Sequence, residues 1–268
     1  MNAPANNMAL VLRSDKDGVR RLTLNRADAR NALSAALMGA LQQALDDTAA
    51  DQSVRVVVIA ANGKVFSSGH DLKEMAALRG SADKGRAAYE ALFTQCSRLM
   101  QTIVRLPVPV IAQVQGVATA AGCQLVASCD LAVAAADARF ATPGVNIGLF
   151  CSTPMVALSR NVSRKAAMEM LLTGEMVAAE DAKQIGLINR VVSPAELESE
   201  TWKLAQLVAS KPRATVKTGK EAFYRQLEMG LDDAYAYTSK VMTENMLAAE
   251  AKEGIGAFIE KRKPEWPE

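Results

Sequence analysis

The feature that most constrains the fold is a repeated succession of an apolar strand, a loop with glycine and a helix. Residues 54–61, VRVVVIAA, form an almost continuous β-branched run, which is typical of a strand covered on both faces of a sheet. A loop ending at Gly69 follows, and HDLKEMAAL then predicts a helix. Residues 108–116, VPVIAQVQG, repeat the strand and the glycine before TAAGCQLVASC, and DLAVAA at 130–135 is a third strand. Strands that alternate with helices predict an α/β fold.

The two ends of the chain differ in pattern. Near the N-terminus GVRRLTLN alternates apolar and polar residues as a strand does, and Ser34 is placed to cap a helix with Leu37, Leu41 and Leu45 on one face. Beyond about residue 150 the strand signals fade and helical stretches dominate. We therefore expect a strand-and-helix core over residues 1–200 and a helical C-terminal region over residues 201–268.

Composition excludes several classes of function. The 268 residues carry a formal net charge of +2, which is too small to indicate nucleic acid or an anionic membrane as a partner. No apolar run approaches the roughly 20 residues that a membrane span needs. The opening MNAPANNMA lacks the basic start and apolar run of a signal peptide, so we expect a loose tail and a cytoplasmic protein.

Cysteine and histidine are too sparse for a metal centre. The four cysteines, Cys96, Cys123, Cys129 and Cys151, have no C-x-x-C spacing, and His70 is the single histidine. A zinc site is therefore not expected, and reduced thiols are the default interpretation.

Two of the loops have the form of one binding site. The loop before HDLKEM and the loop before AGCQLV each precede a helix, whose first turn leaves N–H groups unpaired. Two such groups that converge would form an oxyanion hole, and Gly69, Ala121 and Gly122 are small enough to admit a carbonyl group. The alternative is ordinary α/β connection chemistry. A phosphate loop is weakly supported, because GKVFSSG does not match G-x-x-x-x-G-K-[ST] and no G-x-G-x-x-G opens a helix.

Several motifs together resemble a known family. The segments NRADARNALS, KVFSSGHDLKEM, VQGVATAAGCQLVASCD, FATPGVNIG, LLTGE and AKQIGLINRVV occur in the order of the crotonase (enoyl-CoA hydratase/isomerase) superfamily, from about residue 8 to residue 263. FSSGHDLKE and GLFCSTP resemble its enoyl-CoA hydratase domain-containing branch. The resemblance implies a spiral of ββα units with a helical C-terminal region that packs homotrimers, often paired into hexamers. It also implies an acyl-CoA thioester as substrate, with coenzyme A as part of that substrate and no separate cofactor.

The resemblance assigns roles to particular positions. It places the two oxyanion-hole N–H groups on His70 and Ala121. The substrate-binding positions that it implies are Asp28, Ala29 and Arg30 beside the CoA tail, with Arg30 a possible phosphate partner, then Ser68, His70, Asp71, Leu72 and Lys73 at the acyl-pantetheine tunnel, and Gly116 and Ala121. His70 is expected to act first through its backbone, with its imidazole held by loop contacts; a direct acid/base role is the alternative.

Both catalytic glutamates of the family's hydratases are replaced. The first position is Gln124, which can orient a water but cannot take its proton, and the second is Gly144, which has no side chain. Loss of one general acid/base group typically costs ~10²–10⁴ in rate. Efficient hydration by the usual route is therefore not expected, whereas stabilisation of a thioester enolate remains possible.

Three explanations for the missing acids stay open. Another group of the protein can serve as the base, and the nearby candidates are His70, Asp71, Glu74 and Cys151. A small anion can replace it, as bicarbonate does in some naphthoate synthases with glycine at the position of Gly144. Finally, the chain can be a non-catalytic acyl-CoA-binding or assembly protein.

Overall fold

The computed structural model describes residues 9–267, so the opening segment 1–8 lies outside the described residues. A six-stranded sheet forms the centre, with the order β1-β2-β3-β5-β7-β10. Its strands are β1 (Val11–Lys16), β2 (Val19–Leu24), β3 (Val56–Ala61), β5 (Val110–Val114), β7 (Leu131–Ala135) and β10 (Arg190–Val192). β1 and β2 are antiparallel and every other neighbouring pair is parallel. The strands predicted at residues 18–25, 54–61, 108–116 and 130–135 are all present.

A second, smaller sheet has the order β4-β6-β8-β9. It consists of β4 (Val65–Ser67), β6 (Val117–Thr119), β8 (Arg139–Ala141) and β9 (Val177–Ala178), in which β4, β6 and β8 are parallel and β9 is antiparallel to β8. Along the chain β3 leads to β4, β5 to β6 and β7 to β8. Each turn of the chain therefore places one strand in each sheet, and three successive turns stack into a spiral.

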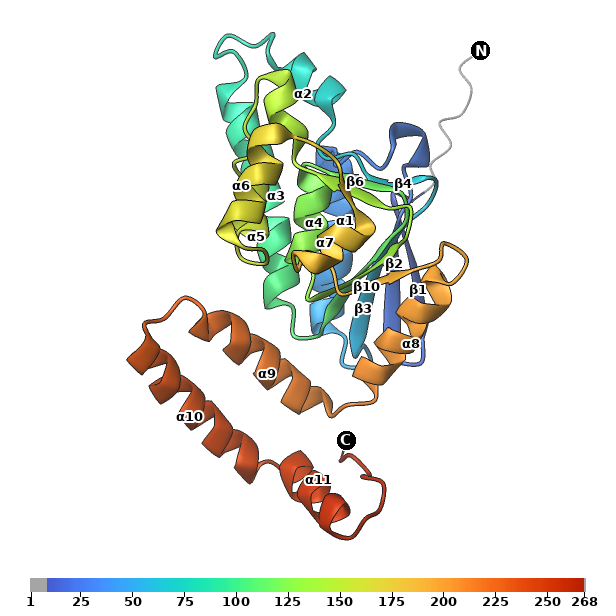
Figure 1. The fold of residues 1–268 in the computed structure, drawn as a ribbon, viewed down its shortest axis with the longest axis vertical. Helices are drawn as coiled ribbons and strands as arrows, with labels where there is room; N and C mark the ends of the chain where they lie inside the picture. The colour runs from blue at the N-terminus through green and yellow to red at the C-terminus, as the bar shows by residue number, and fades with distance from the viewer. Residues whose placement is uncertain (1–8, 268) are drawn as a thin grey trace.

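Helices pack around the two sheets and continue beyond them at the C-terminal end (Figure 1). They are α1 (Ala35–Ala50), α2 (Leu72–Leu78), α3 (Arg86–Arg105), α4 (Ala121–Ser128), α5 (Pro154–Leu158), α6 (Arg164–Thr173), α7 (Ala179–Gln184), α8 (Leu197–Ala209), α9 (Arg213–Gln226), α10 (Leu231–Leu247) and α11 (Ala249–Ile259), with 3₁₀ turns at Ala27–Ala29 and Pro143–Ile147. Ser34 caps α1 as predicted, since its side chain accepts the Leu37 N–H. The α/β fold class expected from the sequence is confirmed.

The central sheet is buried on both faces, as its β-branched strands predict. In β3, Val57 and Ile59 join the large core under α1, α3 and α4, whereas Val56 and Val58 face the smaller core under α8. This alternation follows from the two-residue period of a strand. Burial on both faces explains why the run at residues 54–61 contains no polar face.

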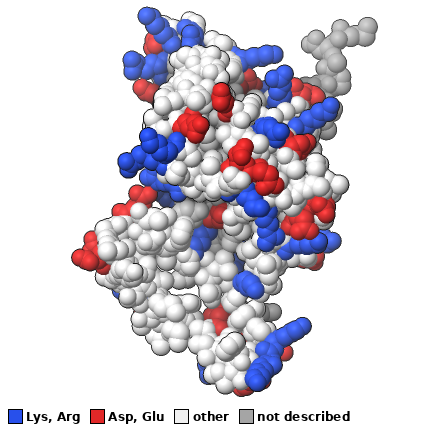
Figure 2. All heavy atoms as spheres, in the orientation of Figure 1, with Lys and Arg blue, Asp and Glu red and all other residues white. Residues whose placement is uncertain are grey.

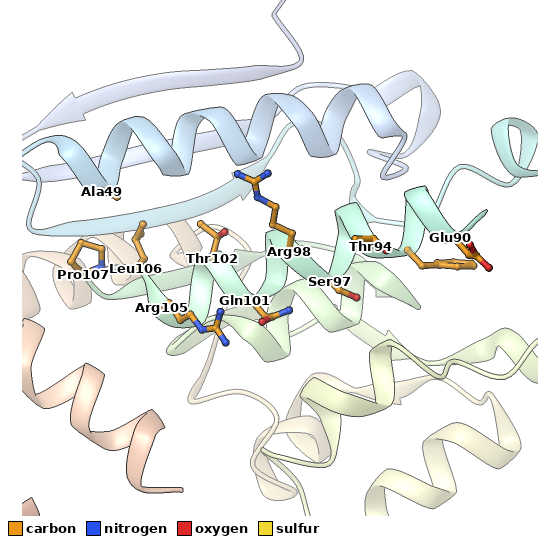
Figure 3. Close-up of a pocket in the computed structure, with 11 residues that line it drawn as sticks. Ala49, Glu90, Thr94, Ser97, Arg98, Gln101, Thr102, Arg105, Leu106 and Pro107 are labelled. Atoms are coloured by element: carbon orange, nitrogen blue, oxygen red, sulfur yellow. The ribbon is translucent and has the colours of Figure 1, made fainter. Parts of the chain in front are cut away.

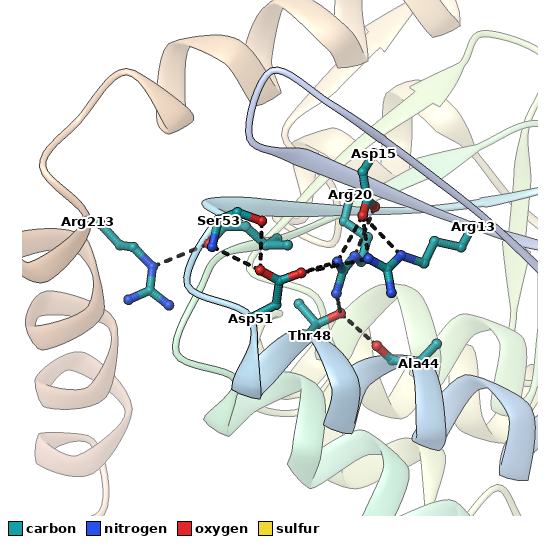
Figure 4. Close-up of polar contacts among 9 residues, drawn as sticks. Arg13, Asp15, Arg20, Ala44, Thr48, Asp51, Ser53 and Arg213 are labelled. Carbon is teal, nitrogen blue, oxygen red and sulfur yellow. Dashed lines mark hydrogen bonds and ion pairs between the residues drawn. The ribbon is translucent and has the colours of Figure 1, made fainter. Parts of the chain in front are cut away.

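A fully buried arginine joins β2 to the end of α1 (Figure 4). The Arg20 side chain has no exposed surface and donates to Asp15 at 2.9 Å and to Asp51 at 2.6 Å. It also donates to the Thr48 hydroxyl at 3.1 Å. Two carboxylates and a hydroxyl thus compensate the burial of the guanidinium group.

The C-terminal helices extend away from the sheets as an arm formed by α9, α10 and α11 (Figure 1). Ala222 and Ala257 are the buried residues of these three helices, and α10 buries none. The second half of the chain is not wholly helical, because β9 and β10 each add a short strand to a sheet edge. Two- and three-residue strands carry too little pattern to be predicted. Within residues 9–267, the structure contains no helix that is long and apolar enough for a membrane span.

Candidate active site

Three loops leave the same edge of the smaller sheet. Ser67 of β4 pairs with Ala118 of β6, and Thr119 of β6 pairs with Ala141 of β8. Because these strands are parallel, the segments that follow them emerge side by side. The segments contain His70, Ala121 and Gly144 respectively, so the spiral brings together three positions that are far apart in the sequence.

The first two loops are in direct contact at Gly69. Its φ angle is +87°, and a Cβ atom placed there would lie 2.9 Å from the Ala120 Cβ and 3.2 Å from the Ala121 nitrogen. A side chain would therefore force the loops apart. Glycine at this position lets the backbone before His70 lie against the first residue of α4.

Strained backbone precedes α4. Ala120 has φ 50° and ψ −119°, a combination that non-glycine residues rarely adopt, and its N–H donates to the Ala141 carbonyl at 2.9 Å. α4 begins at the next residue, Ala121. Within residues 9–267, neither the His70 N–H nor the Ala121 N–H donates to a backbone carbonyl. The strain at Ala120 was not predicted from the sequence, since nothing in TAAG distinguishes it from an ordinary helix start.

The segment 28–31 is tied to the β4 loop. The Ser67 hydroxyl donates to the Asn31 carbonyl at 2.9 Å, and the Ser68 N–H donates to the Arg30 carbonyl at 3.1 Å. These contacts place the exposed Asp28 and Arg30 beside the loop that contains His70. Ala29 lies between them in the same turn.

Asn31 has a role that the sequence did not reveal. It is fully buried with φ 49°, its side-chain oxygen accepts the Arg26 N–H, and its amide group donates to the Asn62 and Val65 carbonyls. Asn31 therefore clamps the segment 28–31 to the start of β4. The sequence did not predict this role, because asparagine often occupies left-handed positions in ordinary turns that have no such contacts.

Asp71 is committed to structure. One carboxylate oxygen caps α2 by accepting the Lys73 and Glu74 N–H groups, and the other accepts from Arg26 at 2.7 Å. The Arg26 hydrogen bond is the largest cause that holds the pKa of Asp71 below its usual range. Leu72 and Lys73 are exposed on the first turn of the helix.

The His70 imidazole has one held nitrogen and one free nitrogen. Nδ1 lies 3.4 Å from the Leu33 carbonyl oxygen, and the ring meets Phe93 of α3 edge to face at a centroid distance of 5.6 Å. Nε2 is buried without a hydrogen-bond partner in the described part of the chain. Burial lowers the pKa of His70, while the Leu33 carbonyl and the charge of Glu74 act in the opposite direction.

Gln124 lies one turn into α4 on the side that faces α3. The side chain is 4% exposed, and its Oε1 accepts from the Cys96 thiol at 3.8 Å. Burial raises the pKa of Cys96 to about 12, so this thiol keeps its proton at neutral pH. The Gln124 carboxamide therefore accepts from a neutral thiol.

Gly144 is closely covered by its own loop. A Cβ atom there would lie 2.8 Å from the Leu149 carbonyl oxygen and 2.9 Å from the Cys151 Sγ. Packing alone therefore requires glycine at this position, and the glycine is not in itself evidence for a bound anion. The Thr142 hydroxyl, two residues earlier, is buried and unpartnered among the described residues.

Gly116 is the one predicted site residue that lies elsewhere. It precedes β6, at the opposite end of that strand from Ala121, and a Cβ atom there would lie 1.9 Å from the Lys64 carbonyl oxygen. Close packing of two backbones accounts for this glycine. Its part in substrate binding stays a prediction, as do the roles of the other site residues.

Comparisons with known proteins agree on one family. The family described as enoyl-CoA hydratase/isomerase matches residues 14–268. The chain is 50% identical over 250 residues to the mitochondrial enoyl-CoA hydratase domain-containing protein 3 of Homo sapiens, covering 93% of this chain and 81% of that protein. It is 49% identical over 257 residues to the protein of the same name from Xenopus laevis, covering 96% and 86%.

The names of these relatives correct one expectation. The proteins from Xenopus laevis, Homo sapiens, Rattus norvegicus, Mus musculus and Danio rerio are all called mitochondrial. The expected cytoplasmic location is contradicted by these names and is wrong. The reasoning failed because the composition of the opening residues does not distinguish the cytoplasm from an organelle.

Solved structures agree with the sequence comparisons. The crystal structure of a Mycobacterium smegmatis enoyl-CoA hydratase is 56% identical with a TM-score of 0.92, covering 96% of this chain and 98% of that one. The crystal structure of the human enoyl-CoA hydratase domain-containing protein 3 is 48% identical with a TM-score of 0.91, covering 96% and 100%. The spiral of two sheets is thus the crotonase fold. The chain belongs to the enoyl-CoA hydratase/isomerase (crotonase) family, in its enoyl-CoA hydratase domain-containing branch.

Proposed function

We propose that this protein binds an acyl-CoA thioester and stabilises its enolate between the backbone N–H groups of His70 and Ala121. The observation that carries the proposal is the contact at Gly69, whose Cβ position would be 3.2 Å from the Ala121 nitrogen. Two N–H groups without backbone acceptors at adjoining loops are the arrangement that an oxyanion requires. The strain at Ala120 supports the same assignment, because strained residues cluster at functional sites.

Hydration by the two-glutamate route is not part of the proposal. Gln124 cannot accept the proton of a water, and Gly144 has no side chain and no room for one. The CoA moiety would lie beside Asp28, Ala29 and Arg30, with the pantetheine chain along Ser68 and residues 70–73. Arg30 is exposed and is a suitable partner for a phosphate group.

The test uses two thioesters. Crotonyl-CoA reports hydration and butyryl-CoA in D₂O reports exchange of the α-proton, while calorimetry measures the affinity for each. We expect binding and slow α-deuteration with little hydration. Hydration of crotonyl-CoA at the rates of ordinary hydratases would contradict the interpretation of Gln124 and Gly144, and absence of measurable affinity for either ester would overturn the proposed function.

A non-catalytic acyl-CoA-binding or assembly protein is the second candidate. It is favoured by the replacement of both acids, since a binder needs the loops and not the carboxylates. Binding without hydration or exchange would favour it.

We also propose that the arm formed by α9–α11 joins copies of this chain into a homotrimer or a dimer of trimers. α10 buries none of its residues, yet Leu231, Tyr235 and Leu247 on it are 68–78% exposed, as are Phe258 and Ile259 of α11 at 84% and 72%. In Figure 2 the visible face of this arm is mostly uncharged. Apolar surface of this extent typically marks an interface.

A further inference from the structure

Four side chains were candidates for the missing base, and three are committed elsewhere. Both carboxylate oxygens of Asp71 are used, by the α2 cap and by Arg26. A carboxylate oxygen of Glu74 accepts the Ala35 N–H at 3.0 Å and so holds the start of α1. Burial raises the pKa of the Cys151 thiol, which therefore stays protonated and is not a base at neutral pH.

The fourth candidate, His70, retains an unused lone pair. A carbonyl oxygen only accepts hydrogen bonds, so the Nδ1 opposite the Leu33 carbonyl must carry the ring proton. In the neutral ring Nε2 is then the basic nitrogen, and it has no partner in the described chain. Burial favours the neutral ring, and Glu74 is the charged group whose field acts against it.

The contacts of the His70 ring connect it, through α3, to the first turn of α4. Phe93, which touches the ring, is one helical turn from Cys96 on α3, and Cys96 in turn contacts Gln124 of α4. Gln124 is one turn from Ala121, whose nitrogen adjoins the Gly69 loop. The imidazole is therefore one member of a circuit of contacts that includes the first turn of α4, where the thioester carbonyl of the proposed function would bind.

We propose that His70 Nε2 is the base that removes the α-proton of the bound thioester, an inference that rests on the proposed function. The C–H bond at the α-carbon breaks and its proton bonds to Nε2. The electron pair of that bond forms the carbon–carbon double bond, and the π pair of the carbonyl group moves onto oxygen to give the enolate. The backbone N–H groups of His70 and Ala121 donate to that oxygen. The imidazolium then returns a proton to carbon, and in D₂O it returns a deuteron after exchange with solvent.

Access to Nε2 requires a small opening, because the atom is enclosed in the free protein. The Phe93 ring that contacts the imidazole is 36% exposed and also lines a groove of about 750 Å³ along α3. Figure 3 shows the groove along Glu90, Thr94, Ser97 and Gln101, which share one face of the helix. Proton transfer to Nε2 would therefore require the Phe93 ring to shift toward this groove.

The experiment measures α-deuteration of butyryl-CoA by wild-type protein, His70→Ala and His70→Gln. Both substitutions keep the backbone N–H and remove the basic nitrogen. We expect exchange to fall by about 100-fold or more, as is typical for a lost general base, with affinity for butyryl-CoA changed less than about 3-fold. Added imidazole should restore part of the exchange in His70→Ala and less in His70→Gln, where the glutamine side chain fills the space. Asp137→Asn, an exposed change outside the site and the groove, is the control and should exchange as the wild type does.

The outcomes separate this assignment from the proposed function. If His70→Ala exchanges the α-proton at the wild-type rate, the imidazole is not the base, whereas the oxyanion hole formed by the backbone N–H groups is unaffected. Binding of butyryl-CoA without any wild-type exchange would also overturn it and favour the non-catalytic binder. If the wild-type protein has no measurable affinity for the thioester, both the role of the imidazole and the proposed function are wrong. Circular dichroism of each variant checks that the fold is kept.

Discussion

The position of a Cβ atom on Gly144 would be 2.9 Å from the Cys151 Sγ, so the two residues occupy adjoining parts of one small space. The Leu149 carbonyl oxygen closes the same space from the other side at 2.8 Å. At Gly144 the loop therefore covers its own backbone and leaves no room for a side chain. Restoring the acid at this position requires more than a change of one residue.

We predict that Gly144→Ala destabilises the protein by about 1–3 kcal/mol, the usual cost of overpacking. The added methyl group would displace backbone, since a carbonyl oxygen cannot swing aside as a side chain can. Gly219→Ala is the matched control, because a Cβ there meets no atom within 4 Å and lies inside α9. That change should stabilise by up to ~1 kcal/mol through helix propensity. Urea unfolding compares the two, and Gly144→Ala as stable as the wild type would contradict the packing.

The arm is tied to the core by a buried ion pair. The Lys220 ammonium group donates to Asp130 at 2.7 Å and to the Ile103 and Val108 carbonyls at 3.0 and 3.1 Å, and the Tyr224 hydroxyl donates to Asp130 at 2.9 Å. We predict that Lys220→Met leaves the Asp130 carboxylate without its cation and costs about 3–5 kcal/mol.

Hydrogen exchange locates that effect. Amide protons of α9 should lose protection in Lys220→Met, whereas Lys217→Met, an exposed change on the same helix, should leave them unchanged. Equal protection in the two variants would mean that α9 is held by other contacts.

Acid should weaken the cluster around Arg20. Hydrogen bonding to Arg20 is the largest cause that lowers the pKa of Asp15, and the Ser53 hydroxyl is the largest cause that lowers the pKa of Asp51 to about 2. Because the folded-state pKa values lie below the unfolded value of about 3.9, the stabilisation is complete above that value and is lost as pH falls.

A variant isolates this dependence. The difference in unfolding temperature between wild type and Asp51→Asn should be largest at neutral pH and should shrink as pH falls from about 4 to about 2, because the unfolded chain binds the proton at a higher pH than the folded protein does. Asp137→Asn, a change of an exposed aspartate, is the control and should show no such trend. If the difference in unfolding temperature between wild type and Asp51→Asn does not change with pH, the ionised Asp51 carboxylate is not what stabilises the wild type.

The exposed apolar surface of the arm predicts self-association. Leu247→Asp and Phe258→Asp place charges at positions that are 78% and 84% exposed in the single chain. Light scattering should report a trimer or a hexamer for wild type and a smaller species for these variants, since charge at a buried contact is costly. Lys240→Asp, also on α10, is the control for the added charge. A monomeric wild type would contradict the role of the arm.

Local patterns were enough for the main elements. The β-branched run at residues 54–61 predicted a strand, because a strand that is buried on both faces has no polar side. Ser34 predicted the start of a helix, because its hydroxyl group can accept a hydrogen bond from a backbone N–H of the first turn. Beyond residue 150 the same reasoning missed β9 and β10, which two and three residues define only by pairing with distant strands. The unusual backbone conformations of Asn31 and Ala120 were not predicted either, because contacts with distant segments of the folded chain impose them.

By itself the sequence determined the α/β class and the family, because these follow from periodicity and from motifs of adjacent residues, whereas the positions of the missing acids stay a prediction. Only the tertiary structure decided which side chains are free to act. The pairing of β4, β6 and β8 brings together the loops of His70, Ala121 and Gly144. Partners from distant segments occupy Asp71 and Glu74, whereas His70 Nε2 has no partner among residues 9–267. The physical reason is that a hydrogen bond between distant segments depends on register and packing, which no local pattern records.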